Sequence, residues 1–238
     1  MTSGLCWTEL AQALEHEHDV IMPDARGHGQ SSAPEHGYSY QDHAADLAGF
    51  IQALRLPPVF LLGHSMGGMT AAVVASRYPE LLRALVLADP TFLSPKVQQE
   101  VWKSDVADQH RRVLALPLKA LLAEARGRHP NRSEQTLALF AQARLQTSLS
   151  AFEVLRPPNP DYAAMVRAIS IPCLLLYGDK GIVSAVVAAE LQRLHPGLQA
   201  EQIREAGHVV HLDQPERFTA AVKRFLRSME DNGSTETC

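Results

Sequence analysis

The chain is poor in the residues that mark several protein classes. It has only three cysteines among 238 residues, Cys6, Cys173 and Cys238. An odd number of widely spaced cysteines does not form a disulfide framework, so we expect a reducing, cytoplasmic location. No run of about 18 apolar residues is present, so no membrane span is predicted. The first residues also lack the basic and apolar regions of a signal peptide.

Basic residues are not in excess either. The chain has 22 Lys and Arg residues against 26 Asp and Glu residues, for a formal net charge of −4. A nucleic-acid-binding surface needs a basic excess, so no nucleic-acid partner is predicted. No cluster of Arg or Lys marks a phosphate or coenzyme site, and His211 near His208 has no further ligand cluster around it. We therefore predict neither a cofactor nor a metal.

What the chain does contain is an alternation of strand and helix patterns. Its length suits one α/β domain with a substantial core, and its 46% hydrophobic content is ordinary for a soluble globular protein. Alternation of this kind is typical of a mostly parallel sheet covered by helices on both faces. Strands are predicted near residues 20–22, 58–62, 84–88, 172–178 and 199–204. Helices are predicted near residues 7–15, 40–54, 66–77, 184–195 and 215–229.

Residues 91–165 interrupt this alternation with a helical pattern. We interpret them as a helical lid inserted into an α/β core made of residues 1–90 and 166–229. Residues 230–238 are polar and are expected to form a disordered tail. The apolar side chains of the central block would line an acyl pocket or form the lid's own core: Phe92, Trp102, Leu114, Leu116, Leu118, Phe140, Leu149 and Phe152.

The segment Gly63-His64-Ser65-Met66-Gly67 is the most informative motif. It follows an apolar strand pattern and precedes a helix rich in small residues, which is the context of a nucleophile elbow. In such an elbow the serine hydroxyl projects from a strained turn toward substrate. We expect Gly63 and Gly67 to be required because a β-carbon at either position would collide with a neighbouring strand or helix. His64 is expected to point away from Ser65.

Three blocks resemble the α/β-hydrolase superfamily: residues 23–31 (PDARGHGQS), residues 62–68 (LGHSMGG) and the late pair Gly207-His208. The resemblance spans essentially the whole chain, and its motifs identify the family far better than any substrate. It implies that Ser65 is the nucleophile and that His208 is its general base. It also implies that the backbone N–H of Met66 is one donor of the oxyanion hole.

The acid of the implied triad has two candidates. In the family it usually follows the strand that ends here at Gly178, often by three residues, and that position is Gly181. Asp179 is preferred because a shorter loop would present its carboxylate at the same place. Asp89, which ends the strand after the elbow, is the rival, since some relatives take their acid from there. Either carboxylate would orient the imidazole and stabilise the imidazolium.

The second oxyanion donor normally comes from a loop marked by His-Gly, and no such block precedes Trp7. By resemblance, the strand that feeds this loop and the family's first two strands are missing. A missing strand would leave a gap of roughly 9–10 Å, because neighbouring strands lie about 4.8 Å apart. Either the polypeptide is longer, or the sheet closes differently, or another segment or chain fills the gap. We expect a longer polypeptide.

The implied activity is hydrolysis of a small-molecule carboxylic ester or lactone through an acyl-enzyme on Ser65. Amide hydrolysis, C–C bond hydrolysis and cofactor-free perhydrolysis are alternatives on the same triad. Haloalkane dehalogenation is disfavoured because it needs a carboxylate at the elbow. A non-catalytic binding protein with this fold is the alternative outside enzymes, and the oligomeric state is left open.

Overall fold

The computed structural model describes residues 2–234. It divides into two compact units. Unit 1 combines Met1–Ser39 with Pro95–Asn159, and unit 2 combines Tyr40–Ser94 with Pro160–Cys238. Unit 1 therefore contains most of the predicted lid, together with the first residues of the chain, which the sequence pattern places in the core.

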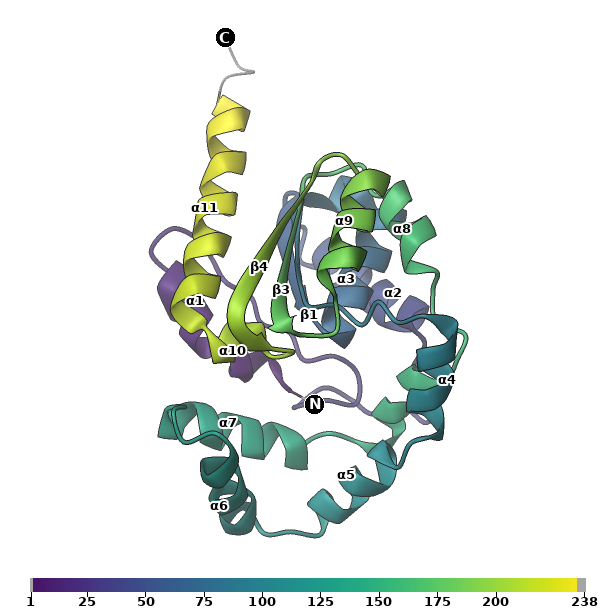
Figure 1. Cartoon of the computed structure of the whole chain (residues 1–238), viewed down its shortest axis with the longest axis vertical. Coiled ribbons are helices and arrows are strands. Elements are labelled where there is room, and N and C mark those ends of the chain that lie inside the picture. The colour runs from purple at the N-terminus through teal and green to yellow at the C-terminus, as the bar shows by residue number, and fades with distance from the viewer. Residues whose placement is uncertain (1, 235–238) are drawn as a thin grey trace. The chain divides into compact units, whose positions relative to one another are not determined.

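Unit 2 is built on a parallel sheet of four strands in the order β1-β2-β3-β4. The strands are β1 (Val59–His64), β2 (Leu82–Ala88), β3 (Cys173–Lys180) and β4 (Leu198–Gly207). The helices of this unit are α2 (Tyr40–Ala53), α3 (Met66–Arg77), η2 (Pro79–Leu81), α8 (Tyr162–Ala168), α9 (Ala185–Leu194), α10 (Val210–Asp213) and α11 (Pro215–Ser234). In Figure 1, α3 and α9 lie on one side of the strands and α11 lies on the other. The predicted α/β fold with helices on both faces is confirmed.

The two central strands form the core of this sheet. β2 is apolar from residue 84 to 88 and β3 from residue 173 to 177, and Leu85, Leu87, Leu175 and Leu176 are fully buried. Near-continuous apolar strands are expected where helices cover both faces of a parallel sheet. On α3 the residues from Gly68 to Ala75 are all buried, and because all of them except Met69 have small side chains, the helix packs closely against the sheet. This packing fixes the start of α3 relative to the end of β1.

The strand predicted at residues 20–22 is wrong. Val20 and Ile21 are 38% and 48% exposed, and the segment has no strand assignment. Three apolar residues form a strand only beside a hydrogen-bonding neighbour, and no described strand pairs with them. The backbone packs instead against the N-terminal turn, where a β-carbon on Gly4 would lie 2.1 Å from the carbonyl oxygen of Met22. In the sheet of the described residues, β1 is an edge strand. That the family's first strands are missing stays a prediction.

Unit 1 has only helices among its described regular elements. They are η1 (Gly4–Trp7), α1 (Thr8–Leu14), α4 (Pro95–Lys103), α5 (Val106–Leu114), α6 (Leu118–Arg128), α7 (Glu134–Leu145) and η3 (Leu149–Leu155). Val113, Leu121 and Ala141 form a small buried core between α5, α6 and α7. The helical pattern predicted for the central block is thus present, and its apolar residues divide between a buried core and exposed positions such as Leu118.

The C-terminal helix extends beyond its predicted end. α11 runs to Ser234, into the segment 230–238 that we expected to be disordered, and residues 235–238 lie outside the described residues. No proline interrupts the chain after Pro215, so nothing forces the helix to stop at residue 229.

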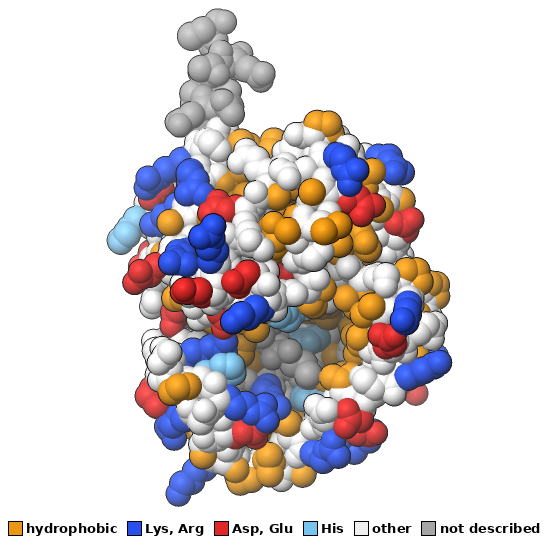
Figure 2. Space-filling view, in the orientation of Figure 1, with side chains coloured by type: hydrophobic (Ala, Val, Ile, Leu, Met, Phe, Trp, Pro, Cys, Tyr) orange, Lys and Arg blue, Asp and Glu red, His pale blue; other side chains and the backbone are white. Residues whose placement is uncertain are grey.

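Charged side chains of both signs are mixed on the face shown in Figure 2. One pair on unit 2 is Arg224 with Glu201, whose charged atoms lie 2.5 Å apart. Within the described residues, no helix combines the length and apolar character needed to cross a membrane.

Candidate active site

The elbow forms where β1 passes into α3. Ser65 follows His64, the last residue of β1, with φ 54° and ψ −121°, an unusual conformation for a residue other than glycine. Its N–H donates to the carbonyl oxygen of Ala88 at the end of β2 (3.1 Å). The strained turn therefore presents Ser65 at the carboxyl edge of the sheet.

The two glycines of the elbow differ in what they require. A β-carbon on Gly63 would lie 2.2 Å from the carbonyl oxygen of Gly67, so this position excludes any side chain. The same expectation for Gly67 is wrong, because a β-carbon there has no described atom within 4 Å outside its own stretch of helix. Gly68 is the second crowded position, with Pro90 2.9 Å from a β-carbon. The close approach of strand and helix thus depends on Gly63 and Gly68.

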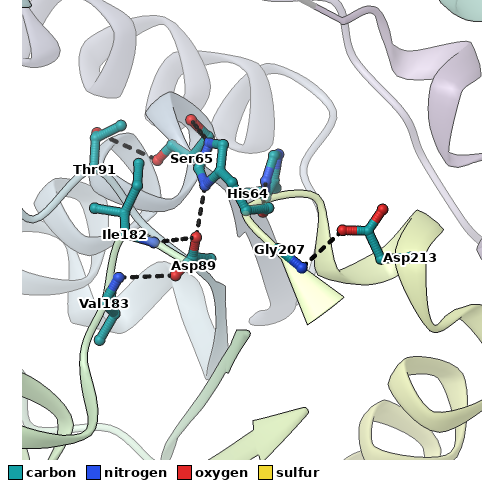
Figure 3. Close-up of polar contacts among 9 residues, drawn as sticks. His64, Ser65, Asp89, Thr91, Ile182, Val183, Gly207 and Asp213 are labelled. Atoms are coloured by element: carbon teal, nitrogen blue, oxygen red, sulfur yellow. Dashed lines mark hydrogen bonds and ion pairs between the residues drawn. The ribbon is translucent and has the colours of Figure 1, made fainter. Parts of the chain in front are cut away.

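Hydrogen bonds from α3 and from the segment after β2 hold the Ser65 backbone. Its carbonyl oxygen accepts from the N–H of Met69 (3.1 Å) and from the N–H and hydroxyl of Thr91 (3.2 and 3.4 Å; Figure 3). The hydroxyl of Tyr40 in turn lies 3.0 Å from that of Thr91 in a buried contact. These contacts offset the strain of the elbow, and no motif in the sequence marks Tyr40 or Thr91 as part of the site.

His208 lies directly after β4 and joins the serine to a carboxylate. Its Nε2 is 2.8 Å from the hydroxyl oxygen of Ser65, and its Nδ1 is 2.6 Å from Oδ2 of Asp89. Because a carboxylate only accepts hydrogen bonds, Nδ1 carries a proton in this arrangement. In the neutral imidazole Nε2 is then the acceptor, and the Ser65 hydroxyl donates to it.

Asp89 is fully buried at the end of β2, with φ 39°. Besides His208, its carboxylate accepts from the backbone N–H groups of Ile182 (2.8 Å) and Val183 (3.0 Å; Figure 3). A buried carboxylate is tolerated only when such donors replace the water that it has lost. The loop after β3 thus supplies two donors that hold Asp89 in place.

The preferred candidate, Asp179, makes a different contact. Its Oδ1 accepts from the N–H of Ala206 (3.1 Å), and hydrogen bonds from the backbone of Glu205 and Ala206 lower the pKa of this carboxyl. The structure therefore places Asp89, and not Asp179, on His208. The physical reason lies at Gly181, where a β-carbon would be 2.6 Å from Oδ1 of Asp89. Asp89 occupies the space beside the position at which the family's acid was expected, and the glycine there was the available signal.

The other residues considered from the sequence are Met66, as an oxyanion donor, and His211, as a metal ligand. Met66 is the first residue of α3, where helix geometry leaves its N–H without an intrahelical acceptor. Among the described residues no three His, Cys, Asp or Glu side chains gather as metal ligands. The His211 ring packs against His64, with ring centroids 4.9 Å apart, and against Phe218.

Comparison with known proteins identifies the family. The sequence model of the alpha/beta hydrolase fold matches residues 1–215. The chain belongs to the alpha/beta hydrolase family. The resemblance seen in the elbow, the early glycine-rich turn and the late Gly-His pair is therefore confirmed.

Individual relatives span most of the chain. A 2-(acetamidomethylene)succinate hydrolase of Mesorhizobium japonicum is 30% identical over 225 residues, covering 90% of this chain and 80% of the relative. An N-formylmaleamate deformylase of Pseudomonas putida is 30% identical over 230 residues, covering 94% and 84%. The structure of a thermophilic esterase from Thermogutta terrifontis has a TM-score of 0.74 at 27% identity, covering 96% and 86%. The relatives are alpha/beta hydrolases, which supports a hydrolase activity for this chain.

Proposed function

We propose that this alpha/beta hydrolase cleaves a small-molecule carboxylic ester or lactone through an acyl-enzyme on Ser65. The observation that carries the proposal is the continuous line of hydrogen bonds from the Ser65 hydroxyl through the His208 imidazole to the buried Asp89 carboxylate. A serine hydroxyl is a weak nucleophile at its own pKa and needs an adjacent base oriented by a third group. Ser65, His208 and Asp89 make the contacts that a nucleophile, its base and the group that orients the base require.

In the proposed reaction His208 Nε2 takes the proton as Ser65 Oγ bonds to the carbonyl carbon. The bond to the leaving oxygen then breaks, and the imidazolium returns that proton to the alcohol. Water adds to the acyl-enzyme by the same steps, which releases the acid and restores Ser65. Asp89 keeps the proton on Nδ1 and stabilises the imidazolium, and the N–H of Met66 donates to the oxyanion.

Two relatives favour amide hydrolysis as the second candidate. The names of the Mesorhizobium and Pseudomonas proteins describe cleavage of an acetamido-substituted acid and removal of a formyl group from a maleamate. The similarity to the esterase from Thermogutta supports an ester as the substrate. The triad chemistry is the same for both, since each begins with attack on a carbonyl carbon. Matched p-nitrophenyl acetate and p-nitroacetanilide assays would rank them.

Labelling of Ser65 by a fluorophosphonate tests the proposal. We expect one label per wild-type chain and none in Ser65→Ala, together with a fall of roughly 10³–10⁶-fold in p-nitrophenyl acetate turnover. Ser76→Ala is the matched control, because Ser76 lies on the same helix and its hydroxyl donates to the nearby carbonyl of Val73. A folded wild-type chain that neither takes the label nor turns over esters or amides would favour a non-catalytic role.

A further inference from the structure

The turn that carries His208 is held by side chains from other elements. Glu205 has φ 60°, in the left-handed region that residues other than glycine rarely adopt. The N–H of Ala206 donates to Asp179 on β3 (3.1 Å), and the N–H of Gly207 donates to Oδ2 of Asp213 on α10 (2.9 Å; Figure 3). A strained turn persists only when its surroundings determine it, so these contacts set the backbone from which His208 projects.

The third contact comes from the elbow itself. Nε2 of His64 lies 2.7 Å from the backbone carbonyl oxygen of His208. A carbonyl oxygen only accepts, so Nε2 of His64 carries the hydrogen and donates it. Ser65, the next residue, bonds the imidazole of the same His208. Two consecutive residues therefore hold His208 at two points, one on its backbone and one on its side chain.

From this arrangement we infer that His64 is a positioning residue for the proposed reaction. It fixes the His208 backbone to the elbow and so sets the distance and direction between Ser65 Oγ and His208 Nε2. Asp213 supports the same turn from the other side, at Gly207. The inference rests on the proposed function, because positioning has meaning only if Ser65 and His208 react.

The environment of His64 suits this task. Burial, and next the nearby positive charge that His208 acquires, lower its pKa to about 4. At neutral pH His64 is therefore uncharged and keeps a single N–H for the His208 carbonyl. The two imidazole rings have centroids 4.6 Å apart. A neutral His64 does not oppose the imidazolium that forms on His208 during proton transfer.

Paired substitutions separate positioning from simple packing. His64→Phe keeps a ring but removes the donor, whereas His64→Gln keeps an N–H donor on a side chain of similar reach. Asp213→Ala and Asp213→Asn form the second pair, because asparagine retains an oxygen that can accept from Gly207. Each variant is titrated with a fluorophosphonate to obtain the binding constant of the reagent and the maximal rate of Ser65 labelling.

We expect His64→Phe to lower the maximal labelling rate by about 10–100-fold with an unchanged reagent binding constant, since misplacement by about 1 Å has effects of this size. The maximal labelling rate of His64→Gln should stay within about threefold of the wild-type rate. The rate of Asp213→Ala should be lower than that of Asp213→Asn. Wild-type rates in His64→Phe, or equal losses in the Phe and Gln variants, would overturn the inference.

A measurement on the unaltered protein covers the case in which His64→Phe does not fold. The ¹⁵N shifts of the His64 ring should report a neutral imidazole protonated at Nε2. Protonation at Nδ1 alone would overturn the inference. Absence of labelling in the wild type would contradict the proposed function itself. The tautomer of His64 is measured independently of labelling, so the two failures can be told apart.

Discussion

At the scale of single residues, Asp89 and Gly181 form a complementary pair. The carboxylate lies where a side chain at position 181 would need space, and the neighbouring N–H groups of Ile182 and Val183 bind it. The loop after β3 has a glycine at the position where the family's acid was expected. Its backbone N–H groups instead bind Asp89, which follows β2. Its backbone donors, rather than its own side chains, serve the site.

This pairing predicts different effects for two matched substitutions. Asp89→Asn should lower turnover of p-nitrophenyl acetate by about 10³–10⁴-fold, because an amide no longer holds the required tautomer of His208. Asp179→Asn removes the same charge but retains an oxygen that can accept from Ala206, so turnover should stay within about threefold. Steady-state kinetics of both variants, with circular dichroism to verify folding, provide the measurement. Equal losses in the two variants would contradict the assignment of Asp89.

At the scale of elements, the strand–turn–helix unit of β1 and α3 sets the site. Ser65 reaches the sheet edge because Gly63 lets the helix backbone approach the strand, and because Thr91 and Met69 bind the Ser65 carbonyl. The sequence pattern around the elbow predicted this unit within a residue or two at each boundary. It did not distinguish a glycine required by close packing from one that is not.

Substitution of the two glycines of the elbow should therefore change the free energy of unfolding by different amounts. Gly63→Ala should lower the free energy of unfolding by about 2–3 kcal/mol, because its β-carbon would overlap the Gly67 carbonyl. Gly67→Ala should leave that free energy unchanged or raise it by up to about 1 kcal/mol, since alanine favours the helix. Urea unfolding curves of both variants measure the difference. A larger loss for Gly67→Ala than for Gly63→Ala would show that this account of the elbow is wrong.

At the scale of the whole molecule, histidines with a lowered pKa connect folding to pH in both units. Burial is the main cause that lowers the pKa of His28 and His110 in unit 1, and that of His64 in unit 2, the last to about 4 from 6.5. At pH values between the lowered pKa of each histidine and its ordinary pKa, the unfolded chain binds protons that the folded chain does not. The free energy of unfolding must therefore fall as the pH falls below 6.5, and this contribution levels off below the folded pKa.

We accordingly expect the urea midpoint to be lower at about pH 5 than at about pH 7.5, with a smaller decrease in His64→Gln than in the wild type. His36→Gln is the control, because the His36 side chain is 87% exposed. Carboxyls with a lowered pKa, such as that of Asp179, act in the same direction but below this pH range. Identical decreases in the wild type and His64→Gln would contradict the assignment of His64 as a group that is neutral in the folded chain.

The sequence by itself determined the family, the elbow, the order of strands and helices from residue 40 onward, and the pairing of Ser65 with His208. These features depend on local patterns: apolar runs, helical spacing and glycines at fixed distances from the serine. The short strand predicted near residue 21 failed because strand formation needs a hydrogen-bonding neighbour, which lies beyond any local pattern.

Only the tertiary structure decided which carboxylate contacts His208 and how the His208 turn is held. Asp89 and Asp179 end neighbouring parallel strands, so both lie at the same edge of the sheet and look alike in sequence. The choice depends on the space beside Gly181, and on whether the surrounding backbone donors belong to the loop after β3, as for Asp89, or to the last residues of β4, as for Asp179. The bond from His64 to the His208 carbonyl joins residues 144 positions apart, and folding alone brings them together.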